Sequence, residues 1–60
     1  MSSVYNPESE ITAEIERLEL EARDVRRRAD HAKADEDKRV LKTQLAELEE
    51  QIELLRAKLP

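Results

Sequence analysis

Two runs of evenly spaced aliphatic residues constrain what this chain can fold into. In each run the steps alternate between four and three residues, the heptad pattern of α-helices that pack along one line. The runs are out of phase, because Ala32 and Leu41 hold equivalent heptad positions but lie nine residues apart. At about 100° per residue, a straight helix would therefore turn the two apolar stripes to opposite sides. The first seam is Ile11, Ile15, Leu18, Ala22, Val25, Ala29 and Ala32, and the second is Leu41, Leu45, Leu48, Ile52, Leu55 and Leu59.

A hairpin removes this mismatch and pairs the two seams. If the chain folds about Asp35, Ile11 meets Leu59 and Ala29 meets Leu41, and each pair joins an a position to a d position, as antiparallel packing does. We therefore predict an all-α fold, an antiparallel helical hairpin of the two-helix coiled-coil type. Its expected parts are a flexible tail with the N-cap over residues 1–6, one helix over 7–33, a turn over 34–37 and a second helix over 38–59.

The charges around residues 31–39 are also typical of a turn. Bases precede the phase break, and three acids, Asp35, Glu36 and Asp37, follow it. Bases near the end of one helix and acids at the start of the next stabilise both helix dipoles, with Asp35 as the candidate N-cap. An unbroken helix is the alternative, because no Gly or Pro interrupts this segment and Lys33 could pair with Asp37 four residues on.

The composition supports a helical protein without a membrane segment. Charged residues make up 43% of the chain, and Gly and Cys are absent, a mixture typical of coiled coils and long helices. Because cysteine is absent, the chain can form neither disulfides nor thiolate metal sites. No apolar run approaches the roughly 18 residues that cross a bilayer, and no apolar stretch follows Met1 as a signal peptide requires. We expect a cytoplasmic protein that does not bind membranes.

A single hairpin of this length offers only a thin core, so a second buried face is expected. Between the helices, Glu19 is expected near Glu49 and Arg26 near Lys42, and both pairs carry like charges. Residues 23–42 hold eight bases and five acids, a net charge of +3, whereas the remainder holds three bases and ten acids, a net charge of −7. Two antiparallel hairpins would set unlike halves together, which predicts a homodimeric four-helix bundle. Three apolar residues off the seams are candidates for the second apolar face: Leu20, Val40 and Leu54.

The expected architecture resembles the Rop family of plasmid copy-number regulators, which are short helical hairpins that dimerise into four-helix bundles. The resemblance covers the chain length, the aliphatic seam and the acidic sequence Ala34, Asp35, Glu36 at the turn. It implies RNA binding through a basic helix face. A net charge of −4 departs from that role.

Two groups of side chains are candidate functional sites. His31 and the neighbouring carboxylates suggest a metal or acid–base site, but a two-helix chain offers no pocket around them, so we expect a solvated turn and no catalytic, metal or cofactor site. A basic belt near the turn could bind phosphates or pair with the acids of a second hairpin, and we favour pairing because stacking aromatics are missing. The belt consists of Arg26, Arg27, Arg28, Lys38, Arg39 and Lys42.

The sequence thus predicts a small non-enzymatic protein-interaction module. Its expected partners are a second copy of the chain and another protein. A nucleic-acid-linked regulator of the Rop-like kind, using the basic belt, is the alternative.

Overall fold

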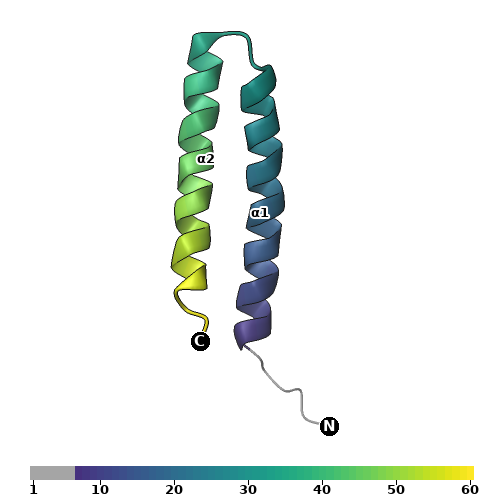
Figure 1. The fold of residues 1–60 in the computed structure, drawn as a ribbon, viewed down its shortest axis with the longest axis vertical. Helices are drawn as coiled ribbons and strands as arrows, with labels where there is room; N and C mark the ends of the chain where they lie inside the picture. Colours follow the sequence, from purple (N-terminus) through teal and green to yellow (C-terminus); the bar gives the residue numbers. More distant parts are fainter. Residues whose placement is uncertain (1–6) are drawn as a thin grey trace.

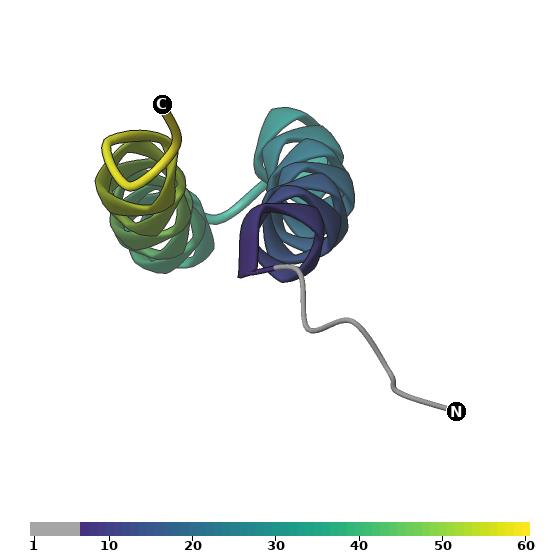
Figure 2. The same ribbon diagram turned by 90° about the horizontal axis from the view of Figure 1, so that it is seen from below.

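The protein is an antiparallel hairpin of two long helices, as the seams predict. In this computed structural model, which describes residues 7–60, α1 spans Pro7–His31 and α2 spans Asp35–Arg56. The helices lie side by side, with the connection at one end and the start of α1 beside the end of α2 (Figure 1). The end view shows α1 and α2 in a single layer, and no other part of residues 7–60 packs over either face of the pair (Figure 2). The unbroken helix is therefore excluded, whereas the expected tail and N-cap over residues 1–6 lie outside the described residues.

The connection is shorter than predicted and needs no glycine. α1 ends at His31, two residues before the expected boundary, and α2 begins at Asp35, three residues before it. The intervening turn is made by Ala34, whose extended backbone (φ −83°, ψ 136°) redirects the chain, and no described residue has a positive φ. Because ordinary extended geometry is open to any residue, the helices can reverse direction without a left-handed position.

Ala34, and not Asp35, is the N-cap of α2. Its carbonyl accepts the first hydrogen bond of the helix from the Lys38 amide at 3.1 Å, and no side chain caps this end. Asp35, Glu36 and Asp37 instead occupy the first turn, where their negative charge stabilises the helix dipole. The acids were correctly placed at the start of a helix, but the predicted capping role of Asp35 is wrong.

α2 ends at Arg56, before the predicted boundary at residue 59, and a tighter turn follows it. After Arg56 the amides of Lys58 and Leu59 donate to the carbonyls three residues earlier, each at 3.0 Å. Such short-range bonds satisfy carbonyls that an α-helix leaves unpaired at its end. Leu59 remains packed against the core through this turn.

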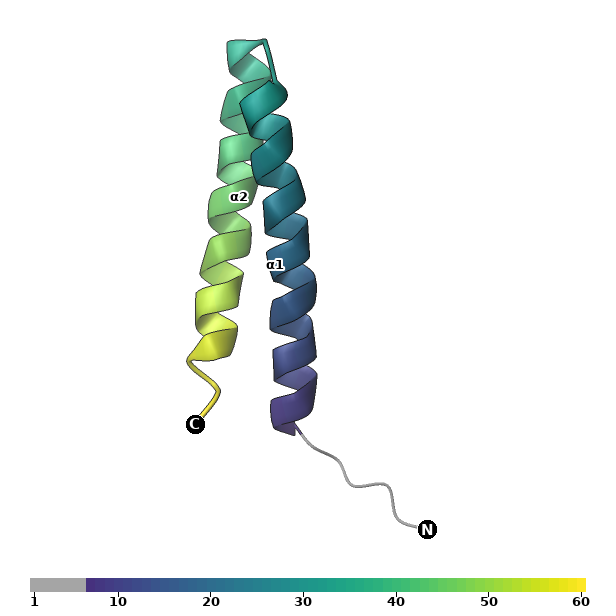
Figure 3. The same ribbon diagram turned by 45° about the vertical axis from the view of Figure 1, so that its right-hand side comes forward.

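The core runs along the predicted seams. Its buried cluster consists of Ile15, Leu18, Ala22 and Ile52, and the residues packed against it are Ile11, Leu45, Leu48, Leu55 and Leu59. Viewed from the side, the helices are inclined to each other rather than strictly parallel (Figure 3). Nine of the predicted seam residues therefore pack together in this core, and Val25 and Ala29 of α1 are buried as well.

Candidate interaction surfaces

Burial is distributed unevenly between the two helices. On α1 five seam residues are buried, whereas on α2 only Ile52 is. No side chain of the described chain is fully buried. Four leucines of α2 and one just beyond its end are only partly buried and so remain partly open to solvent: Leu41, Leu45, Leu48, Leu55 and, after the helix, Leu59.

The difference follows from the sizes of the facing residues. The α1 seam carries Ala22, Val25 and Ala29 where the α2 seam carries leucines. Leucine side chains cover the small residues opposite them, so that Ala22 is only 5% exposed. The same leucines are wider than the surface they cover, and their outer edges stay uncovered. Apolar surface left in this position stabilises the fold only if something else packs on it.

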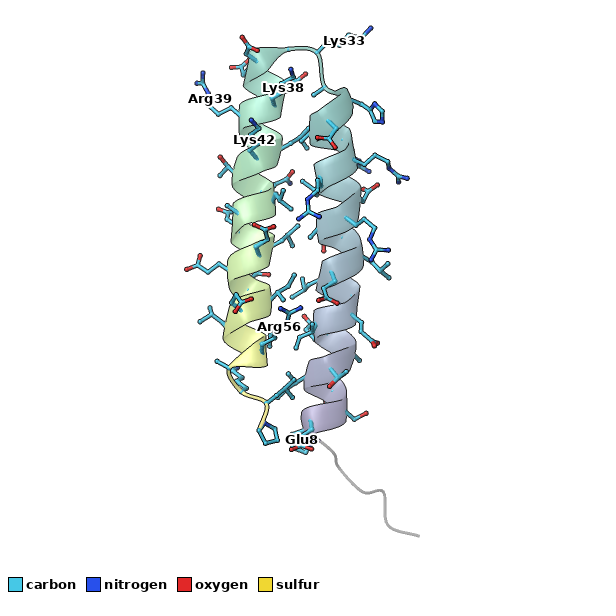
Figure 4. The ribbon with its side chains drawn as sticks, in the orientation of Figure 1. Glu8, Lys33, Lys38, Arg39, Lys42 and Arg56 are labelled. Carbon is cyan, nitrogen blue, oxygen red and sulfur yellow. The ribbon has the colours of Figure 1, made fainter. Side chains whose placement is uncertain are left out.

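One side of the hairpin is bridged by cross-helix ion pairs. We call this side the arginine flank, and it is lined by Glu19, Ala22, Arg23, Arg26, Glu49, Ile52, Glu53 and Arg56. Arg26 Nη2 lies 3.0 Å from Glu49 Oε2, and Arg56 Nη2 lies 2.5 Å from Glu19 Oε2. Figure 4 shows Arg56 reaching from α2 toward α1. The two pairs extend across the groove above the buried Ala22 and Ile52.

These pairs correct the like-charged contacts expected from the sequence. The prediction placed Glu19 near Glu49 and Arg26 near Lys42 only because the backbones of each pair lie at about the same height along the hairpin. The long arginine side chains instead reach along the axis to an acid on the other helix, so Arg26 bonds Glu49 and Arg56 bonds Glu19. Charge repulsion within the hairpin therefore does not argue for a dimer.

The opposite side of the hairpin, the glutamine flank, has a different character. It is lined by Arg17, Leu18, Glu21, Val25, Gln44, Glu47, Leu48 and Gln51. Among residues 7–60, no ion pair joins α1 to α2 on this side; its cations pair with acids of their own helix, Arg17 with Glu14 and Arg28 with Asp24. The apolar floor formed by Leu18, Val25 and Leu48 is therefore not bridged. Sequence reasoning missed Gln44 and Gln51, although they continue a four–three spacing that starts at Val40.

The three apolar residues off the seams are all exposed, but they do not share one face. Val40 is 57% exposed and Leu54 is 61% exposed. Their spacing from Gln44, Glu47 and Gln51 places both on the same side of α2, continuing the glutamine flank toward its two ends. Leu20 is 62% exposed and lies about half a turn away from the α1 seam, on the surface that faces away from α2.

The three consecutive arginines of the basic belt point to different sides of α1. Consecutive residues are about 100° apart, so Arg26, Arg27 and Arg28 cannot point to one face. Each is also occupied: Arg26 with Glu49 at 3.0 Å, and Arg27 and Arg28 with the two oxygens of Asp24 at 3.2 and 3.1 Å. These three residues do not form a common cationic surface.

The cations nearest the turn are arranged differently. Lys38, Arg39 and Lys42 line one shallow hollow of α2 together with Asp35, Thr43 and Ala46. Figure 4 shows all three at the turn end of the hairpin, with Lys33 on the connection itself. Within the described chain no ion pair is formed by these four cations. The structure thus splits the predicted belt into three paired arginines on α1 and three cations of α2 near the turn. Together with Lys33 on the connection, we call these the turn cations: Lys33, Lys38, Arg39 and Lys42.

One ion pair within α1, between Glu14 and Arg17, affects the pKa of its arginine. Glu14 raises the pKa of Arg17 above its ordinary value, first through a side-chain hydrogen bond and then through its negative charge. Arg17 therefore carries its positive charge at neutral pH, as arginine does. Because Arg17 pairs with Glu14 within α1, it forms no ion pair with α2.

Two further observations concern other kinds of site. Across residues 7–60, the His, Asp and Glu side chains form no group of three that could hold a metal ion. Neither of the two helices has the length and apolar character required to cross a membrane.

Comparison of the chain with known protein families, curated proteins and solved structures finds no match.

Proposed function

We propose that this hairpin is a non-enzymatic interaction module that pairs with a second copy of itself and, in that form, binds another protein. The observation that carries the proposal is the incomplete burial of five leucines on α2 or just beyond its end, which remain partly exposed although they continue the α2 seam. A chain of 60 residues has little apolar surface to lose. A four-helix bundle would cover these leucine edges from a second hairpin and give the core its missing layer.

The charge distribution supports the same proposal. The turn half of the chain carries a net charge of +3 and the remainder a net charge of −7. Antiparallel association of two hairpins brings unlike halves together and disfavours the parallel arrangement, in which like halves would meet. The outer surfaces of the bundle, including the turn cations, remain available to a partner protein with an acidic surface.

The proposal predicts that stability depends on protein concentration. Folding coupled to association follows mass action, so the thermal midpoint of the wild-type chain should rise by several degrees over a hundredfold increase in concentration. Circular dichroism at 222 nm measures it directly. A thermal midpoint that stays constant over this range would show that the single hairpin is the folded unit and would reject self-association.

The turn cations support a second function, that of a nucleic-acid-linked regulator. Lys38, Arg39 and Lys42 are gathered on one surface of α2 and form no ion pair in the described chain. Clustered cations of this kind can contact phosphates. The ten acids outside the turn half would repel a polyanion over most of the hairpin, which is why we place this function second.

A pair of triple charge reversals separates the two functions. If the protein binds nucleic acid, labelled structured RNA should bind at about micromolar concentration and lose affinity steeply with salt. K38E/R39E/K42E should then abolish binding, whereas R26E/R27E/R28E, whose arginines are already paired, should reduce it less. We expect no RNA binding by the wild-type chain at near-physiological salt. Salt-dependent binding that only the turn variant loses would establish the second function.

A further inference from the structure

Resting on the proposed role in binding another protein, we infer that the turn cations are the docking site and that the partner presents a short acidic segment, a small cluster of neighbouring Asp or Glu side chains. The cations at this end of the hairpin differ from most others because they lack a counter-ion. Arg17, Arg26 and Arg56 each pair with a glutamate. Within residues 7–60, none of the turn cations forms an ion pair.

Lys38, Arg39 and Lys42 point to one side of α2. At about 100° per residue, their directions fall within an arc of about 100°, and the first and last lie about 6 Å apart along the helix axis. All three line one hollow together with Thr43 and Ala46, whose short side chains leave space between the long cationic ones. Lys38 is half-buried, so its stem loses less conformational freedom when an anion binds. Carboxylates can therefore reach all three cations from one direction.

The acids closest in the sequence do not neutralise this surface. Glu36 and Asp37 do not line the hollow, and the helical repeat turns them away from it. Asp35 does line the hollow, but its carboxylate forms no ion pair within residues 7–60. One acid beside three cations leaves the hollow with a net positive charge, which is complementary to an acidic ligand.

The distribution of charge along α2 indicates that this ligand is short. After Lys42, residues 43–55 contain four glutamates and no Lys or Arg. Glu49 and Glu53 lie on the same side of α2 as the turn cations, about 10 Å or more further along the axis. The arginines there, Arg26 and Arg56, are already paired with them and offer a ligand no free cation. A long polyanion would therefore run onto an acidic surface, whereas a short acidic segment contacts the turn end alone. This difference favours a protein segment over a nucleic acid.

Fluorescence anisotropy of a labelled peptide tests this inference with the full chain. The probe is a short peptide with consecutive glutamates between glycine and serine residues, and the control peptide carries glutamine in place of glutamate. At low salt the wild-type chain should bind the acidic peptide but not the control peptide, and binding should weaken as the salt concentration rises. The variant R39Q/K42Q should weaken binding about fivefold, because it removes two exposed ion pairs with the peptide.

The matched control is R23Q/K58Q, which also removes one arginine and one lysine. Arg23 and Lys58 are exposed and form no ion pair within residues 7–60, but they lie away from the turn. The net charge changes equally in both variants, and we expect R23Q/K58Q to weaken binding by less than about twofold. All four substitutions are at the surface, so both variants should keep wild-type helicity by circular dichroism.

Selective loss of peptide binding in R39Q/K42Q supports the inference, whether the chain sediments as a monomer or as a dimer. Equal weakening by the two variants, or no binding of the acidic peptide at low salt, would overturn the docking site while self-association, measured by sedimentation, stands. Single-stranded RNA of about ten nucleotides should bind more weakly than the peptide. Tighter binding of this RNA, lost in R39Q/K42Q, would overturn the acidic protein segment as the ligand and assign the turn cations to nucleic acid.

Discussion

Ile52→Asp should leave the chain unfolded under conditions in which the wild-type chain is helical. Ile52 is the one seam residue of α2 that is buried, at 6% exposed, and it lies in the central cluster with Ile15, Leu18 and Ala22. A carboxylate there would enter this aliphatic cluster, and Arg26 and Arg56, which line the groove beside it, are already paired with Glu49 and Glu19. An uncompensated buried charge destabilises a protein by about 3–5 kcal/mol, which is a large part of the stability of a domain this small.

The matched control is Leu20→Asp, which introduces the same side chain at a residue that is 62% exposed on the outer surface of α1. We expect it to fold like the wild-type chain, because the added carboxylate remains solvated. Helical circular dichroism and its thermal loss measure both variants. Equal helicity of Ile52→Asp and Leu20→Asp would mean that the described core does not hold the helices together.

The second prediction compares two leucines that are buried to a similar degree in the isolated hairpin. Leu45 and Leu48 are both half-buried on α2, but only Leu48 lines the glutamine flank. If a second copy covers that flank, Leu48 becomes a fully buried residue, and Leu48→Ala should cost about 2–5 kcal/mol, as truncation of a core leucine does. Leu45→Ala should cost about half as much, because its edge stays in solvent.

Chemical denaturation of the two variants at one protein concentration measures this difference. Urea midpoints interpreted with a common m-value give the loss of unfolding free energy for each. With a second copy on the glutamine flank, the expected order is a clearly larger loss for Leu48→Ala, widening as the protein concentration rises. Equal losses would indicate that both leucines keep the same exposure in solution, and a larger loss for Leu45→Ala would show that a second copy does not cover the glutamine flank.

The fold could be predicted from the sequence because its determinants are local and periodic. The alternating steps of the two seams identify two amphipathic helices, and the nine-residue interval between Ala32 and Leu41 excludes a common face in one rod. Helix ends were less accurate, by two or three residues. The end of α1 has no glycine to mark it, and the capping position is taken by Ala34, which carries no capping side chain.

The candidate surfaces were less predictable than the fold. The height of the backbone along the hairpin placed Glu19 near Glu49. Arginine side chains, however, span more than one helical turn, so Arg56 reaches Glu19 further along the partner helix. The difference between the two flanks depends on which of these long contacts form. No single residue type marks that outcome in the sequence. The spacing of Val40, Gln44, Gln51 and Leu54 does mark the uncovered side, once the position of the seam on α2 is known.

Sedimentation equilibrium of the wild-type chain at several micromolar-to-millimolar concentrations tests self-association most directly. The single chain has a mass of 7.0 kDa. We predict that the weight-average mass approaches twice that value at high concentration and falls toward the single-chain value on dilution, with helicity falling in parallel. A mass of one chain at every concentration, with helicity unchanged on dilution, would contradict the proposal that this hairpin completes its core with a second copy.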